Sequence, residues 1–334
     1  MGFPQGFVWG AAASSYQIEG AAYEGGKGLS VWDVFTREPG RIYNNHTGDV
    51  ACDHVRRFKE DVALMREIGL QAYRFSISWP RVLPMGTGGI NAAGLGFYDR
   101  LVDELLAAGI APYATLFHWD YPYELYCRGG WLNPESADWF AEYAELMAGK
   151  LGDRVKHWMT LNEHSVFVLL GHQTGEHAPG DRWSQPKILR MAHNVLLAHG
   201  KAVQAVRAAA PGSVQVGAAP TGAVTMPASD AAQDVEAARQ AMFSVAGSGL
   251  WSHSWWMDPS LLGHYPADGL ALYEKDMPEI RPGDMETICQ PLDFYGVNIY
   301  HGSVVRAGAD GKPELVAAAV GEPMTAFPWP VTPD

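Results

Sequence analysis

The sequence predicts an α/β fold with a parallel sheet, and it favours a (β/α)8 barrel over an open doubly wound sheet. Six short apolar segments alternate with amphipathic or loop material of crossover length, and such alternation requires parallel strands. Polar side chains stand at the ends of several of these segments, as on the active face of a barrel. No glycine fingerprint follows the first segment, so nothing supports a dinucleotide-binding sheet.

The composition is typical of one large domain, and its charge argues against negatively charged binding partners. The 334 residues carry 24 basic and 37 acidic side chains, a net charge of −13, and no basic stretch interrupts this surplus. That balance argues against a nucleic-acid partner and against an anionic membrane surface. No linker divides the chain and no apolar run reaches the length of a membrane span, so we expect a single domain over residues 1–334.

The cysteines and the first residues bear on the compartment. Cys52, Cys127 and Cys289 are odd in number and form no CxxC motif, so they give no sign of a disulfide frame. The first residues lack the charged and long apolar regions of a signal peptide. We therefore expect a cytoplasmic protein.

In the first part of the chain, strands are predicted at residues 7–13, 71–79 and 111–119. Between them, apolar residues recur at helical spacing over 53–68 and 95–105, and Gly69 is well placed to end the first of these helices.

The second part begins with Asn133-Pro134, a typical helix opening. Further strands are predicted at 158–163, 213–219 and 293–300, and further helices at 188–209 and 231–247. The ring-rich segment 255–266 is predicted as a loop. Residues 304–334 are rich in Gly, Pro and Ala and show no convincing helix or strand.

The strand at 158–163 carries the most informative polar residues. Asn162 and Glu163 follow apolar Trp158, Met159 and Leu161, so they should reach the active face. A carboxyl group beside an amide, in a chain with 12 Trp and 14 Tyr, suits sugar chemistry. A purely structural alternative also fits, because Thr160 and Glu163 have capping-box spacing and Glu163 could merely begin a helix.

Other strand ends supply further candidates. Arg74 lies inside an apolar strand and needs an acidic or polar partner. The remaining candidates follow strand ends: Gln17, His118, Trp119, Asn298 and Tyr300. His172 and His177 lack the spacing of a zinc protease and no HExxH motif exists, so we expect no metal and no cofactor.

Taken together, the motifs resemble glycoside hydrolase family 1, the β-glucosidase type of retaining glycosidase. The matching segments lie in family order at residues 7–20, 73–81, 116–120, 160–163, 175–180, 258–266 and 294–300. The resemblance implies a (β/α)8 barrel, represented here by about its first six β/α units. It also implies hydrolysis of small-molecule β-linked O-glycosides or oligosaccharides by double displacement.

The resemblance also assigns roles. Glu163 corresponds to the general acid/base, and Asn162 to the donor for the sugar 2-hydroxyl. Arg74 and Tyr300 correspond to groups that support the nucleophile. The substrate-binding residues implied are Gln17, His118, Trp119, Asn162, Asn298 and Tyr300.

The sequence departs from the family mainly at its end. Nothing after Tyr300 matches the motif of the nucleophilic glutamate, and Glu314 and Glu322 lie in poor surroundings for that role. We expect strands seven and eight to be absent, two open sheet edges, and a nucleophilic Glu beyond residue 334. This chain alone should then be inactive. The alternative is a non-catalytic sugar-binding barrel or an inactive fragment.

Smaller departures lie near the acid/base. His164 stands where the family usually has Pro, and on a strand it should point away from Glu163. The Asn that the family has after the fifth strand is replaced near Thr221, which should weaken orientation of the catalytic pair.

Overall fold

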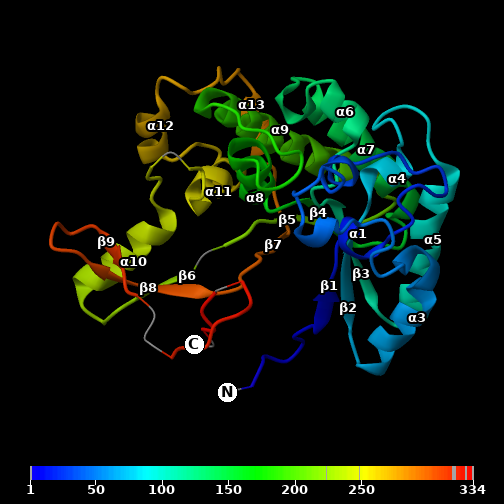
Figure 1. The fold of residues 1–334 in the computed structure, drawn as a ribbon, viewed down its shortest axis with the longest axis horizontal. Coiled ribbons are helices and arrows are strands. Elements are labelled where there is room, and N and C mark those ends of the chain that lie inside the picture. The colour runs from blue at the N-terminus through cyan, green and yellow to red at the C-terminus, as the bar shows by residue number, and fades with distance from the viewer. Residues whose placement is uncertain (1, 223, 248, 318–320, 328, 333–334) are drawn as a thin grey trace.

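A six-stranded parallel sheet forms the centre of the computed structural model, which describes residues 2–222, 224–247, 249–317, 321–327 and 329–332. Its strands are β1 (Gly10–Ala12), β2 (Ala72–Ser76), β3 (Ala111–Phe117), β4 (His157–Asn162), β5 (Gln215–Ala219) and β7 (Phe294–Tyr295). Their spatial order is the order of the chain, and every neighbouring pair is parallel (Figure 1). This arrangement is the predicted run of six barrel strands, so the fold prediction is confirmed.

Helices cover the outer face of the sheet. The larger ones are α3 (His54–Glu67), α5 (Ala92–Ala107), α7 (Ser136–Leu151) and α9 (Gln185–Ala209), while α10 (Ala232–Phe243) packs on a second sheet. Helices α7 and α9 pack against each other, and α9 also contacts β4 and β5. Each buries the apolar stripe that predicted it, because residues three and four apart share one helix face. Examples are Phe140, Tyr143 and Met147 on α7.

Short helices lie in the loops that follow the strands. They are α1 (Ser15–Ile18), α2 (Val31–Phe35), α4 (Trp79–Val82), α6 (Tyr123–Cys127), α8 (His164–Leu169), α12 (Ala267–Tyr273) and α13 (Asp284–Ile288). Two 3₁₀ turns (Tyr43–Asn45 and Gly130–Leu132) and a π-helical turn (Leu170–Thr174) complete these loops. In parallel sheets the loops after the carboxyl ends of the strands carry functional residues.

The predicted helix opening at Asn133-Pro134 lies two residues before the observed start of the helix. The Asn133 side-chain oxygen accepts a hydrogen bond from the Glu135 amide at 2.9 Å, which makes a turn, and α7 starts at Ser136.

Segment 255–266 is also not a loop. It belongs largely to α11 (His253–Leu262), which contains Pro259 and ends at Gly263 with φ 76°. A proline inside a helix normally destabilises it, but Trp255 and Trp256 are buried here and this packing outweighs the local penalty.

The region after residue 300 contains strands that the sequence did not reveal. Strand β8 (Gly302–Ala307) pairs in parallel with β6 (Val224–Pro227) and antiparallel with β9 (Pro313–Leu315). This second sheet packs on α10 through the small residues Ala237 and Ala238, beside Val305. Because this core consists of small side chains, the sequence of these segments shows only a weak hydrophobic pattern.

Strands β1 and β7 end the main sheet, and neither has a second strand neighbour among the described residues. Apolar side chains are exposed at both edges, including Val8 and Trp9 before β1 and Val297 and Ile299 after β7. Among the described residues, no helix is both long and apolar enough to cross a membrane.

Candidate active site

Glu163 occupies the turn between β4 and α8, at the carboxyl end of the sheet. Its backbone is left-handed, with φ 53° and ψ 66°, a conformation that costs a non-glycine residue about 1–3 kcal/mol. Its side chain is buried, with the residue 6% exposed, and makes no capping hydrogen bond to α8. Thr160 instead bonds to His199 at 2.6 Å. The capping-box alternative is therefore wrong.

The Glu163 carboxyl has a specific hydrogen-bond donor. Asn298 Nδ2, from the loop after β7, donates to Glu163 Oε1 at 2.6 Å and to Asn162 Oδ1 at 2.9 Å. One amide group therefore joins the two residues that the sequence singled out on β4.

Asn162 is the centre of this network. A register shift in the pairing of β4 with β5, between Met159 and Asn162, precedes it. Its side-chain oxygen accepts from Arg74 Nη2 at 2.5 Å, and its amide nitrogen lies 3.3 Å from His118 Nε2. Its backbone carbonyl accepts from the Trp119 indole at 3.1 Å. The structure thus brings together predicted residues from β2, β3, β4 and the loop after β7.

Arg74 is a half-buried cation with neutral hydrogen-bond partners. Its Nε donates to Thr115 Oγ1 at 2.9 Å and its Nη1 to Asn298 Oδ1 at 3.2 Å. No carboxylate among the described residues forms an ion pair with it. Burial lowers the pKa of Arg74, while the nearby Glu163 acts in the opposite direction. The predicted polar partners are present, and none of the side chains of Thr115, Asn162 and Asn298 carries a negative charge that would neutralise the guanidinium.

The protonation states suit proton donation. Burial raises the pKa of Glu163 above its ordinary value, although the Asn298 hydrogen bond and the Arg74 charge oppose the shift. Burial, helped by Arg74, lowers the pKa of His118 to about 3, so this imidazole is neutral at physiological pH. The site therefore pairs a carboxyl group whose pKa is raised with a neutral histidine.

Two predicted residues lie outside the hydrogen-bond network. Gln17 is exposed on α1, with no side-chain hydrogen bond to a described residue. Tyr300 is 65% exposed, and its ring packs on Trp329 with 5.6 Å between centroids. Tyr300 still lies within electrostatic reach of Glu163, whose charge adds to the effect of burial in raising the pKa of its hydroxyl.

His164 is not on a strand. Strand β4 ends at Asn162, so His164 becomes the first residue of α8. Its ring is buried, with its centroid 5.7 Å from Trp256 and 6.1 Å from His199. Thr221 meets the loop after β7, where its hydroxyl donates to the Asn298 carbonyl at 3.4 Å.

Sequence reasoning missed Thr115, and it considered His177 by itself only as a metal ligand. Thr115 is a fully buried hydroxyl that binds Arg74, and its only signal was a polar residue inside an apolar strand. His177 packs between Trp32 and Trp119, with 5.5 Å between ring centroids on each side. This contact joins distant segments and left no local signal. In the described part of the chain, no group of three or more His, Cys, Asp or Glu side chains is arranged to hold a metal ion.

Known proteins are similar to this chain along almost its whole length. The family model "Glycosyl hydrolase family 1" matches residues 1–323. Beta-glucosidase A of Acetivibrio thermocellus is 47% identical over 306 residues, covering 91% of this chain and 66% of the relative. Beta-glucosidase A of Thermotoga maritima is 41% identical over 333 residues, covering 99% of this chain and 73% of the relative.

Solved structures agree. The Thermotoga maritima β-glucosidase in complex with deoxynojirimycin superposes with a TM-score of 0.88 at 42% identity, covering 99% of this chain and 73% of that one. The same enzyme has been solved with castanospermine, with a TM-score of 0.87. The chain thus spans about two thirds to three quarters of the length of such relatives. The motifs, the strand order and the network around Asn162 have one explanation: the chain belongs to glycosyl hydrolase family 1.

Proposed function

We propose that this chain supplies the acid/base half of a retaining β-glycosidase site, with Glu163 as general acid/base. The observation that carries the proposal is the buried Glu163 carboxyl, hydrogen-bonded by Asn298 and with a raised pKa. In double displacement one carboxylic acid protonates the leaving oxygen while a carboxylate about 5–5.5 Å away attacks the anomeric carbon. The acid then acts as a base toward water.

The attacking carboxylate is proposed to come from polypeptide beyond residue 334. Arg74 supports this idea, because its guanidinium is half-buried and forms hydrogen bonds only with neutral groups. A carboxylate placed beside it would be held ionised, as a nucleophile must be. Residues 1–334 would then be one catalytic barrel domain without its last two strands.

The proposed substrate is a β-linked glucoside or related sugar. Trp119 offers an aromatic surface for a sugar ring, and the neutral His118 can both donate and accept hydrogen bonds. We assign Asn162, Asn298, Gln17 and Tyr300 to the same pocket. The complexes of the Thermotoga maritima relative with deoxynojirimycin and castanospermine support this substrate class. We also propose a cytoplasmic enzyme, in keeping with its three free thiols.

One observation favours a second candidate, a non-catalytic sugar-binding barrel or inactive fragment. No described carboxylate forms an ion pair with Arg74, and the carboxyl near it, Glu163, is the proposed acid, so the described residues offer no second carboxylate there.

Labelling with a mechanism-based fluoro-sugar, followed by mass spectrometry of peptides, separates the two candidates. The protein expressed from its complete reading frame should be labelled on a glutamate outside residues 1–334. An intact, folded protein that takes up no label would favour the second candidate. Measured turnover of an aryl β-glucoside by residues 1–334 alone would contradict the proposed location of the nucleophile.

A further inference from the structure

The residue after Trp119 is an aspartate with an unusual environment. Asp120 is 1% exposed, and its Oδ2 accepts a hydrogen bond from the Ser15 hydroxyl at 2.8 Å. The Ser76 hydroxyl accepts from the Ser15 amide at 2.7 Å and donates to the Ser15 hydroxyl at 3.1 Å. A buried chain of polar groups therefore ties the end of β3 to the start of α1 and the end of β2.

Both ends of this chain carry proposed sugar contacts. On one side, Asp120 directly follows His118 and Trp119. On the other, Ser15 is the first residue of α1, which carries Gln17. The 2.8 Å hydrogen bond thus joins the two segments that form one wall of the proposed pocket.

The turn at Trp119 needs external support. Trp119 has φ 78°, and the Tyr121 amide donates back to the Trp119 carbonyl at 2.9 Å. A bulky residue in this conformation is strained and persists only where surrounding contacts enforce it. Two contacts do so here: the indole binds the Asn162 carbonyl, and the next residue is held by Ser15.

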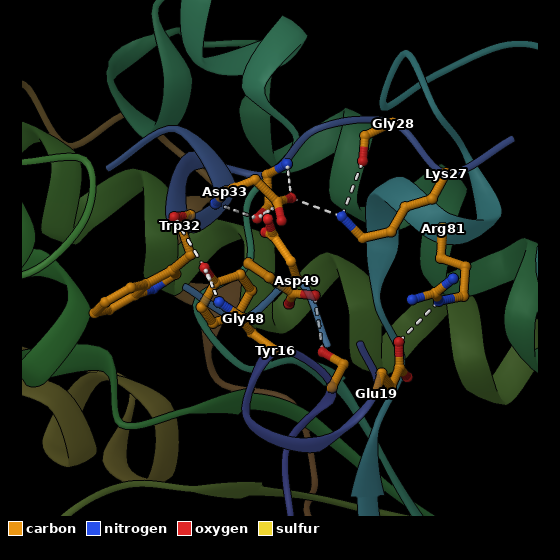
Figure 2. Close-up of polar contacts among 12 residues, drawn as sticks. Tyr16, Glu19, Lys27, Gly28, Trp32, Asp33, Gly48, Asp49 and Arg81 are labelled. Carbon is orange, nitrogen blue, oxygen red and sulfur yellow. Dashed lines mark hydrogen bonds and ion pairs between the residues drawn. The ribbon is translucent and has the colours of Figure 1, made fainter. Parts of the chain in front are cut away.

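The cations near Asp120 already have partners. Asp120 lines a small polar cavity with Lys27 and Arg81. Lys27 binds Asp33 at 2.6 Å and Arg81 binds Glu19 at 2.8 Å, both as buried ion pairs (Figure 2). Asp120 therefore has no cation of its own, and its Oδ1 is buried without a hydrogen-bond partner.

This isolation affects its charge. Burial raises the pKa of Asp120 to about 7, although the Ser15 hydrogen bond, the nearby Ser78 hydroxyl and the charge of Lys27 oppose the shift. Burial therefore favours the neutral carboxyl here, and an amide of the same shape is a close substitute.

We propose that Asp120 is a positioning residue for sugar binding, which holds the His118–Trp119 turn against α1 through its hydrogen bond with Ser15. The proposal rests on the proposed function, because the pocket it shapes is that of the non-reducing sugar. Asp120 does not touch the sugar. It fixes the spacing between Gln17 and Trp119.

The test uses the full chain and the probe deoxynojirimycin, with binding measured by calorimetry. Asp120→Ala should weaken binding at least tenfold. Asp120→Asn should remain within about threefold of the parent protein, because its side-chain oxygen still accepts the Ser15 hydroxyl. Ser15→Ala should resemble Asp120→Ala, and the double variant should be little worse than either single one.

The matched control is Asp284→Ala on α13. This variant removes another carboxylate that is hydrogen-bonded to a buried side chain, that of His193 on α9. It should lower thermal stability without changing probe affinity. Parent-like affinity in a folded Asp120→Ala variant would overturn the proposal, and so would failure of Asp120→Asn to restore binding.

Hydrogen exchange separates this proposal from the proposed function. In Asp120→Ala the amides of residues 15–18 should exchange at least tenfold faster than in the parent and in Asp120→Asn. If the parent binds no probe but this exchange pattern appears, the tie between α1 and the turn stands and the sugar-binding function fails. Unchanged exchange in Asp120→Ala overturns the positioning role.

Discussion

Asn298 Nδ2 lies 2.6 Å from Glu163 Oε1, so an amide from the last strand region holds a carboxyl from the fourth strand. The two residues are 135 positions apart in the sequence, and the pairing of β7 with β5 brings them together. This contact orients the carboxyl and opposes the effect of burial on its pKa.

Removal of the Asn298 amide should raise the pKa of Glu163 further. The donor favours the ionised carboxylate, so Asn298→Ala leaves burial opposed only by Arg74. Carbon-13 NMR titration of the Glu163 carboxyl would measure the change. Asn91→Ala, which removes a helix cap on α5, serves as a control that should leave this titration unchanged. A Glu163 pKa equal to that of the parent would contradict the assigned role of Asn298.

Replacement of Glu163 by glycine should reduce turnover most for substrates with poor leaving groups. General acid catalysis contributes roughly 10²–10⁴-fold, and a good leaving group needs little of it. Azide should then restore rate, because it replaces the base-assisted water in the second step. The measurement is kcat/KM in the enzyme with its second carboxylate present. Glu314→Gly, at an exposed residue on β9, should behave as the parent, and parent-like kinetics for Glu163→Gly would exclude Glu163 from catalysis.

Arg74→Lys should destabilise the fold even though it preserves the charge. Lysine cannot span Thr115, Asn162 and Asn298 as the guanidinium does, so at least one buried oxygen loses its donor. An unpaired buried polar group costs about 1–3 kcal/mol, and urea denaturation should show a loss of this size. The control Arg57→Lys alters an exposed pair with Glu60 and should change stability far less. Equal stability for both variants would contradict the bridging role.

Acidification should destabilise the protein through His164 and His199. Burial lowers the pKa of His164 to about 3 and that of His199 to about 4, whereas both bind protons near pH 6.5 when unfolded. Above pH 6.5 neither state takes a proton and there is no penalty. Below it the unfolded chain is favoured increasingly, by roughly 1.4 kcal/mol per pH unit for each histidine, until the folded pKa is reached.

Urea denaturation at pH 7 and pH 5 would measure this dependence. His164→Leu should reduce the difference between the two pH values by about 2 kcal/mol, because one of the two penalties disappears. The exposed His46→Leu should leave the difference unchanged. A pH dependence that is the same in His164→Leu and in the parent would contradict burial of a neutral imidazole at this position.

The parts of the fold that followed from sequence are those governed by local patterns. The apolar stripe of α3 and the glycine after it fixed that helix, and apolar runs fixed β2, β3 and β4. The prediction missed helix α11 because a proline and several aromatic rings obscured the helical spacing of its residues. Only tertiary packing explains why this segment is helical. The prediction missed β8 because its partners, β6 and α10, lie far away in sequence, and it missed β9 because β9 pairs, among the described residues, only with β8.

For the site, motifs identified Arg74, Asn162 and Glu163 but not how they are connected. No sequence feature placed Asn298 between Asn162 and Glu163, and the left-handed turn at Glu163 depends on the meeting of β4 with α8. Asp120 was part of a recognised motif, yet its charge state depends on burial and on ion pairs between distant residues.

The strand order of the main sheet has a consequence for biosynthesis. Each strand from β2 to β5 pairs with the strand made just before it, so every new strand finds its neighbour already emerged from the ribosome. Arg74 and His118 are synthesised before Asn162, and all three before Asn298. The pocket is therefore assembled from one side, and the amide that orients the acid arrives last.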